Sequence, residues 1–252
     1  MMSSQDDPDL ARGTKPFVEH LHDLRKAIVA AILFAACGIG VAIPLSPVLL
    51  SILKRPLALA DKDPATFLRV LEVTGGVAVA MRLSLWGGLV IAAPFIAWTA
   101  AWFIFPGLTR RERRAALRAA AFSVVLFAAG ILMCYFMTLP PALRFMFYVN
   151  ELVGVGCEFI NVSDYLSFTL MLLLAFGLTF QFPVILLALG SLGFITSDQL
   201  RDKRRHVIVA IFVVSMIVTP PDVLSQVLMA IPLTVLYELC IWIMKAREIR
   251  AA

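Results

Sequence analysis

Long apolar segments separated by short basic loops constrain the fold of this chain more than any other feature. Hydrophobic residues make up 61% of the 252 positions and charged residues only 15%, which leaves more apolar surface than a soluble domain can cover. We therefore predict an all-α integral membrane protein. The net charge of +5 does not indicate a nucleic-acid partner, because the basic residues cluster in loops between the apolar runs, as positive-inside topology requires.

A single membrane domain covering residues 1–252 is predicted to contain six transmembrane helices in the lipid bilayer. The predicted spans are about 27–53, 83–105, 119–139, 165–189, 207–218 and 223–244. Residues 1–15 are polar and acidic, so we expect a flexible cytosolic tail. Residues 16–26 carry apolar side chains at helical spacing and are predicted to form an amphipathic interfacial helix that runs directly into the first span.

The fifth apolar run, 207–218, is short. Its twelve residues cover roughly 18 Å as a helix, whereas the hydrocarbon core is roughly 30 Å thick. The run is therefore either a short span or a re-entrant segment. The charge distribution favours a span, because a crossing places sixteen of the 22 Lys and Arg residues on one face, with both termini in the cytoplasm. The short fifth and sixth spans then form a hairpin.

Proline and capping residues predict where several helices begin or end. Pro44 and Pro47 mark the point where the first span stops being regular, and the Pro140–Pro141 pair is expected to end the third span and open an outer loop. The candidates for the N-cap of the fourth helix are Asn161 and Ser163. The spacing of Thr196 and Gln199 predicts a capping box at the start of the next helix.

The loop from Phe103 to Arg114 concentrates four arginines around one carboxylate, Glu112. Each arginine would cost about 2.5 to 3.5 kcal/mol at the membrane centre, so this loop is expected to face the cytosol. Asp23 and Glu112 are well placed at the cytosolic rim to bind a di-arginine segment, because guanidinium groups bind carboxylates bidentately. Two structural alternatives remain: Glu112 completes a capping box with Thr109, or Asp23 only pairs with Lys26.

Polar side chains within the apolar runs also have two interpretations each. Gln181 lies beside Pro183 in the fourth span and either satisfies freed backbone groups or bridges helices. Glu238 is either near the cytosolic interface or a functional buried acid. Arg82, at the outer end of the second span, is expected to reach freely to the interface. Three residues around the outer hairpin serve either ordinary packing or docking of another helix: Met216, Thr219 and Gln226.

No catalytic or metal-binding arrangement is visible in the sequence. The three histidines lie at the predicted cytosolic edge, outside any H-E-x-x-H motif, and neither a G-x-S-x-G motif nor a phosphate-binding loop is present. The four cysteines include no C-x-x-C pair. We therefore predict a protein that is not an enzyme and that uses no cofactor and no metal.

Four stretches of the sequence resemble the TatC family, the multi-span subunit of the twin-arginine protein translocase. They are His20–Arg25, Phe103–Arg113, Phe176–Pro183 and Thr219–Gln226, with Ala230–Pro232 and Leu236–Glu238 following. The resemblance implies a receptor for folded precursor proteins with twin-arginine signal peptides, working with TatA- and TatB-type single-span subunits in the bacterial plasma (inner) membrane. It also implies a complex with several copies of this chain and transport driven by the proton-motive force.

The resemblance also assigns roles to individual residues. The family's signal-binding positions correspond to Asp23 and Glu112, with Phe103 and Leu108 nearby. Its partner-helix site corresponds to Met216, Thr219 and Gln226. The chain departs from the common family pattern twice, because many members have Glu where this chain has Asp23 and Gln181. Asp23 is one methylene shorter than Glu, and Gln181 supplies no negative charge.

Two other functions fit the composition. A small-solute secondary transporter is the main alternative, but such proteins tend to show internal repeats and broken helices that meet at mid-membrane charges. The sequence shows no repeat relating residues 1–125 to the rest, and Gln181 is its single deep polar side chain. A purely structural scaffold is compatible with the composition but explains neither the short hairpin nor the rim carboxylates.

Overall fold

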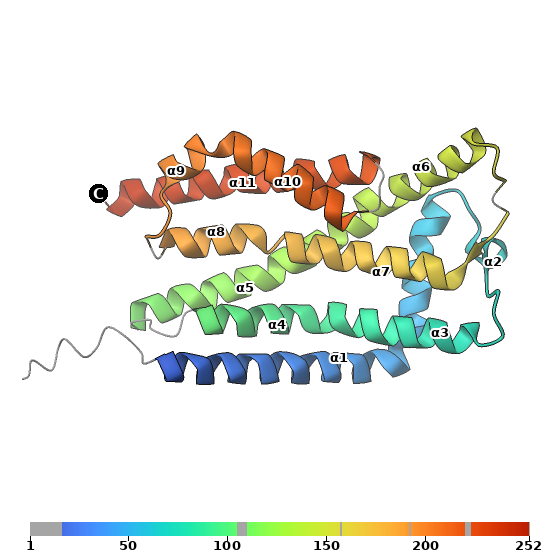
Figure 1. Cartoon of the computed structure of the whole chain (residues 1–252), viewed down its shortest axis with the longest axis horizontal. Coiled ribbons are helices and arrows are strands. Elements are labelled where there is room, and N and C mark those ends of the chain that lie inside the picture. The colour runs from blue at the N-terminus through green and yellow to red at the C-terminus, as the bar shows by residue number, and fades with distance from the viewer. Residues whose placement is uncertain (1–16, 105–109, 157, 192, 220–222, 252) are drawn as a thin grey trace, which may run out of the picture.

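The computed structural model describes residues 17–104, 110–156, 158–191, 193–219 and 223–251. Its long helices lie roughly alongside one another (Figure 1). The α-helices are α1 (Phe17–Leu59), α2 (Pro64–Phe67), α3 (Gly75–Arg82), α4 (Gly88–Ile104), α5 (Arg110–Met133), α6 (Leu139–Leu152), α7 (Val162–Thr179), α8 (Phe182–Ser191), α9 (Ser197–Asp202), α10 (Arg204–Val218) and α11 (Val223–Ala251). Two π-helical turns, η2 (Leu83–Gly87) and η3 (Cys134–Thr138), join α3 to α4 and α5 to α6.

In the described part of the chain, five helical segments are long and apolar enough to cross a membrane. They are His22–Leu59, Gly75–Thr99, Ala121–Leu152, Val162–Gly190 and Val223–Glu248. α10 adds an apolar helix of 15 residues, about 22 Å long at the helical rise. The predicted all-α architecture with membrane-length helices is confirmed, while the sixth crossing and the cytoplasmic termini stay predictions.

Helix α1 continues beyond the predicted end of the first span and passes through three prolines, of which Pro56 is the last. Figure 1 shows that the second half of α1 turns sharply away from the first half. A proline leaves the carbonyl four residues earlier without its helical N–H donor. The carbonyl of Ile52, four residues before Pro56, instead accepts a hydrogen bond from Tyr135 Oη at 2.7 Å. The prolines therefore bend α1 without ending it.

The far end of α1 is a Schellman motif. Asp61 has a φ of 63°, and the Lys62 N–H donates to the Leu57 carbonyl at 3.3 Å. Arg144 of α6 donates to the Leu59 carbonyl at 2.5 Å and pairs with the Asp61 carboxylate at 3.1 Å. The predicted outer loop between the first two spans therefore starts with an ordered helix end that α6 holds in place.

The prediction that Pro140 and Pro141 end the third helix is wrong. They occupy the first turn of α6, where a missing N–H costs little, and the η3 turn joins α6 to α5. The helix continues to Leu152 and ends in a second Schellman motif, with Gly154 at a φ of 80°. Residues 142–152, the first part of the outer loop predicted over about residues 142–164, are therefore helical.

Two other helices are longer than predicted. The second apolar helix begins at Gly75 rather than near residue 83, because α3, η2 and α4 follow one another without interruption. The predicted short sixth span corresponds to α11, which has 29 residues. Figure 1 shows that the adjoining ends of α10 and α11 nevertheless lie short of the bundle end at which α6 ends and α7 begins. The hairpin is therefore short on that side, and the extra length of α11 lies toward its C-terminal end.

A small ordered cap covers the end of the bundle that carries α2. The strands β1 (Leu68–Arg69) and β2 (Ile160–Asn161) pair in parallel there. Phe67 and Phe147 pack edge to face, with their ring centroids 5.2 Å apart, and the Lys62 ammonium lies 5.4 Å from the Phe67 centroid. Asn161 then caps α7 by accepting a hydrogen bond from the Ser163 N–H at 3.2 Å, so Asn161 is the capping residue of the two candidates.

Reciprocal glycine contacts join α5 closely to α7. A Cβ atom on Gly130 of α5 would lie 2.8 Å from the ring of Phe180, and one on Gly177 of α7 would lie 2.5 Å from the ring of Phe127. Each helix thus offers a glycine to an aromatic ring of the other. Small residues at such contacts allow close backbone approach in a membrane bundle.

Candidate functional site

The predicted rim residues come from three helix ends that gather at one end of the bundle. Asp23 is half-buried in the second turn of α1, Phe103 lies in the last turn of α4 and Glu112 in the first turn of α5. Figure 1 shows these three helix ends together, opposite the end that carries α2. Leu108 and Thr109 lie outside the described residues, as do the side chains of Phe103 and Glu112. The choice between a capping role and a binding role for Glu112 therefore stays open.

Gln181 makes a reciprocal contact with Ser123 of α5. The Ser123 hydroxyl donates to Gln181 Oε1, and Gln181 Nε2 donates to the Ser123 carbonyl at 3.1 Å. Ser123 is only 2% exposed. Gln181 lies at the break between α7 and α8, just before Pro183, so this pair ties the break to α5. Of the two interpretations of Gln181, helix bridging is the one that the structure shows.

Glu238 of α11 is ion-paired. Its carboxylate lies 2.7 Å from Arg204 Nη2, and its side chain is 30% exposed. The neighbouring Tyr237 is fully buried and donates to the Leu200 carbonyl at 2.7 Å. Because Arg204 is the first residue of α10, the pair joins the start of α10 to α11. Glu238 is thus a partly exposed, paired carboxylate rather than an isolated buried acid.

The C-terminal part of α11 is also tied to α9. The Ser197 N–H donates to Glu248 Oε1 at 2.9 Å, and the Ser197 hydroxyl donates to Glu248 Oε2. Ser197 follows Thr196, whose predicted capping box with Gln199 is confirmed in both directions. A carboxylate at the first N–H groups of a helix is electrostatically favourable. Sequence analysis missed this contact, because Glu248 lies 51 residues from Ser197.

The three residues of the hairpin separate into two groups. Thr219 is buried and its hydroxyl donates to the Ser215 carbonyl at 2.8 Å, while Gln226 Nε2 donates to the Phe212 carbonyl of α10 at 3.1 Å. Both therefore use their polar groups within the hairpin. Met216, in contrast, is 69% exposed. Of the three residues, Met216 is thus the one whose side chain α10 presents outward.

Arg82 does not reach freely to the interface as predicted. Its Nη1 donates to the Ser163 carbonyl at 2.8 Å and to Ser167 Oγ at 2.5 Å, and lies 4.0 Å from an Asp164 oxygen. These partners belong to the first two turns of α7. Arg82 therefore holds the outer part of the second helix against α7. Sequence analysis could have found this contact only through the serine spacing of four residues, which is a weak signal.

Comparison with known proteins identifies the family. Residues 19–232 match the family model described as TatC, Sec-independent protein translocase protein. The TatC protein of Aquifex aeolicus is 36% identical over 230 residues, which cover 91% of this chain and 95% of that protein. The TatCy protein of Bacillus subtilis is 31% identical over 233 residues, covering 91% and 88%. A crystal structure of the twin arginine translocase receptor TatC in DDM superposes with a TM-score of 0.77 at 36% identity, covering 89% of this chain and 99% of that chain.

Proposed function

The chain belongs to the TatC family of Sec-independent protein translocase proteins, and we propose that it is the receptor and core subunit of a twin-arginine translocase in the bacterial plasma (inner) membrane. In this proposal it binds the twin-arginine signal peptides of folded precursors at its cytosolic face. The observation that carries the proposal is the family match over nearly the whole described chain. It is supported by the position of Asp23, Phe103 and Glu112 on helix ends at one end of the bundle.

Signal binding would depend on the two carboxylates of Asp23 and Glu112. A fully exposed ion pair contributes only about 0.2 to 1 kcal/mol, which is too little for stringent selection of an arginine pair. A partly desolvated hydrogen bond to a charged group contributes roughly 1.5 to 3 kcal/mol, and Asp23 is already half-buried in the free protein. Phe103 and Leu108 would contact the signal peptide beside the arginines, and its apolar segment would lie along the helices.

The neighbours of Glu112 impose a condition on this site. Arg110, Arg111, Arg113 and Arg114 surround Glu112 in the sequence and would repel a basic peptide. Residues 110–114 lie in the first turns of α5, where successive side chains point in different directions around the helix axis. Glu112 can therefore face a bound peptide while its neighbours face the headgroups or the solvent.

Photo-crosslinking to a twin-arginine signal peptide in membrane vesicles tests this assignment. Glu112→Gln and Asp23→Asn should each weaken peptide binding about ten- to a hundredfold, the range expected for losing one charge-assisted hydrogen bond. Asp23→Glu should retain binding, because it restores the longer side chain that many family members have. Glu151→Gln, an exposed change at the far end of α6, is the matched control. Undiminished crosslinking in both Glu112→Gln and Asp23→Asn would refute the receptor role of these residues.

We further propose that single-span TatA- and TatB-type subunits dock near the α10–α11 hairpin. Met216 would provide the apolar contact, while Thr219 and Gln226 keep the hairpin rigid by their internal hydrogen bonds. A photo-reactive residue placed at position 216 should crosslink to a single-span subunit, and one at position 209, which is also exposed on α10, should crosslink less. Equal crosslinking at both positions would argue against a specific site at the hairpin.

The proton-motive force is the energy source that we propose for transport by the assembled complex. Gln181 does not titrate, and its amide is already paired with Ser123. A transport step that requires an ionisable acid at this position is therefore absent from this chain. The proposed complex contains several copies of the chain, which supply more than one signal-binding face.

A further inference from the structure

An apolar groove separates the α7–α8 segment from α10. Its cavity volume is about 320 Å³. Leu178, Phe182 and Ile185 line one wall, and Val207, Ala210 and Val214 of α10 line the other. Leu178 and Ile185 are 56% and 49% exposed, so the groove is open along one side. Met216 and the rim carboxylates of the proposed function are not among its lining residues.

The chemistry of the groove excludes a polar occupant. Thr179 is the one polar side chain among its lining residues, and the Thr179 hydroxyl already donates to the Ala175 carbonyl at 2.6 Å. No lining side chain therefore needs a hydrogen-bond partner from a ligand. The size and lining of the groove match a flexible hydrocarbon chain.

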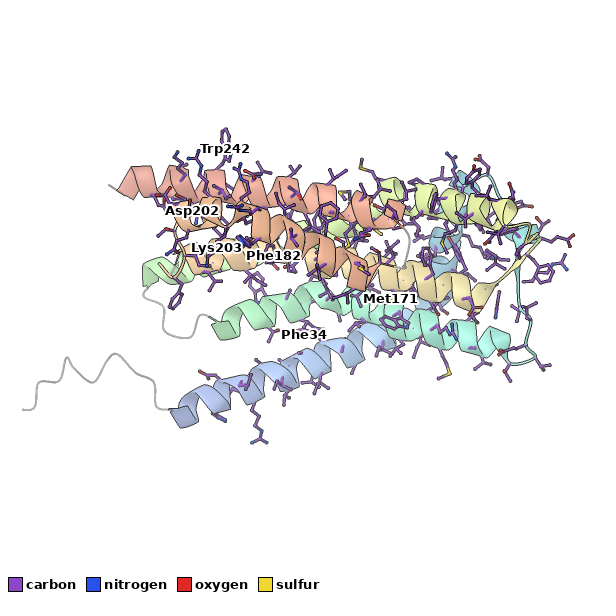
Figure 2. The ribbon with its side chains drawn as sticks, turned by 45° about the horizontal axis from the view of Figure 1, so that its top comes forward. Phe34, Met171, Phe182, Asp202, Lys203 and Trp242 are labelled. Carbon is purple, nitrogen blue, oxygen red and sulfur yellow. The ribbon has the colours of Figure 1, made fainter. Side chains whose placement is uncertain are left out.

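A lysine lies one helical turn before the first lining residue of α10. Lys203 precedes Val207 by four residues and Ile211 by eight, which places it on the same helical stripe as the lining residues. The Lys203 carbonyl accepts a hydrogen bond from the Val207 N–H at 3.1 Å, so Lys203 keeps the register of α10. Figure 2 labels Phe182, which lines the groove, and Lys203 at the α9–α10 junction. Residues 198–206 contain four Lys or Arg and two Asp. Arg204 is paired with Glu238, so Lys203 is the cation that continues the stripe of lining residues.

We propose that this groove is a binding site for an anionic phospholipid. One acyl chain lies between α8 and α10, and the phosphate of the headgroup contacts the ammonium of Lys203. A lysine at the headgroup level attracts an anionic lipid, while a zwitterionic lipid gains little from the same contact. The lipid fills the space between α8 and α10, both of which pack on α11, and thereby supports the position of α10.

Native mass spectrometry of the full chain with defined lipids tests the proposal. The chain is purified, incubated with phosphatidylglycerol or phosphatidylcholine, and examined for bound lipid. The unmodified chain should retain phosphatidylglycerol in preference to phosphatidylcholine. Lys203→Gln should lower phosphatidylglycerol retention roughly fivefold, the effect expected for one lysine near an anionic lipid. Ala210→Phe should abolish retention of either lipid, because the ring fills the groove.

Two matched variants control for general effects. Lys26→Gln removes a lysine from α1, at the same end of the bundle but far from α10 (Figure 1), and Val209→Phe adds a ring on another face of α10. Both should retain lipid as the unmodified chain does. Unchanged lipid retention in both Lys203→Gln and Ala210→Phe would overturn the proposal. So would loss of a co-purifying single-span subunit, rather than of lipid, in Ala210→Phe, because the groove would then belong to a protein helix.

Discussion

Both α1 and the α7–α8 segment contain prolines, but neighbouring helices support the two irregularities in different ways. Along α1, hydroxyl groups of two tyrosines donate to single carbonyls: Tyr135 to Ile52 at 2.7 Å and Tyr165 to Leu53 at 2.6 Å. At the α7–α8 break, Gln181 and Ser123 donate to each other. A proline in a membrane helix frees backbone groups that lipid cannot satisfy. The tyrosine hydroxyls thus serve backbone carbonyls of α1, whereas the Gln181–Ser123 pair joins the α7–α8 break to α5.

The surroundings of the two irregularities differ as well. Gly130 of α5 packs so closely on the α7–α8 break that a Cβ atom there would lie 2.8 Å from Phe180 Cγ and 2.9 Å from the Phe176 carbonyl. At Gly40, four residues before Pro44 in α1, nothing lies within 4 Å of an added Cβ. The α7–α8 break therefore packs closely on α5, whereas the face of α1 that carries Gly40 borders open space. The face that carries Gly38 packs on Gly88 of α4 instead.

The largest expected effect follows from this difference in enclosure. Gly130→Val should lower the free energy of unfolding by about 3 kcal/mol, because overpacking pushes Phe180 and the backbone of α7 away from α5. Gly40→Val should change stability by less than about 1 kcal/mol, since only helix propensity is affected. Unfolding of the purified chain by SDS in mixed micelles measures both. Equal effects of the two substitutions would show that Gly130 is no more tightly packed than Gly40.

The Ser123–Gln181 pair gives a smaller effect with a distinctive pattern. Gln181→Leu alone should destabilise by about 1 to 3 kcal/mol, because it leaves the buried Ser123 hydroxyl without its acceptor. Adding Ser123→Ala should restore part of the loss, since removing both partners of a hydrogen bond costs less than removing one. The same SDS titration of both single variants and the double variant measures the coupling. Strictly additive losses would mean that the two side chains do not depend on each other.

The prolines are visible in the sequence, but the side chains of neighbouring helices that support the irregular segments are not. Pro140 and Pro141 looked like the end of a helix because local propensity ignores the η3 turn that lets the helix continue. Ser123 and Gln181 are 58 residues apart, and nothing in the apolar pattern of either span marks them as partners. The helical architecture follows from local apolar runs, whereas the exact helix ends depend on contacts between helices.

The candidate site divides in the same way. Asp23 and Glu112 could be selected from charge and position alone, because isolated carboxylates beside apolar runs are conspicuous. The two interpretations of Glu238 could not be separated without Arg204, which lies 34 residues away in the sequence and 2.7 Å away in the fold. Likewise, the outward position of Met216 and the inward hydrogen bonds of Thr219 and Gln226 depend on how α10 meets α11. Residue types indicate candidates, and packing decides what each can contact.

The smallest expected effect tests the support of α1. Tyr135→Phe removes only the hydroxyl that donates to the Ile52 carbonyl, and this carbonyl has no helical donor because Pro56 lacks an N–H. The free energy of unfolding should fall by about 1 kcal/mol, the typical value of one hydrogen bond. Tyr148→Phe, at a tyrosine that is 61% exposed, is the matched control and should have no measurable effect in the same SDS titration. If Tyr135→Phe is also without effect, the bend of α1 is maintained by packing alone, and only the α7–α8 break depends on hydrogen bonds from its neighbours.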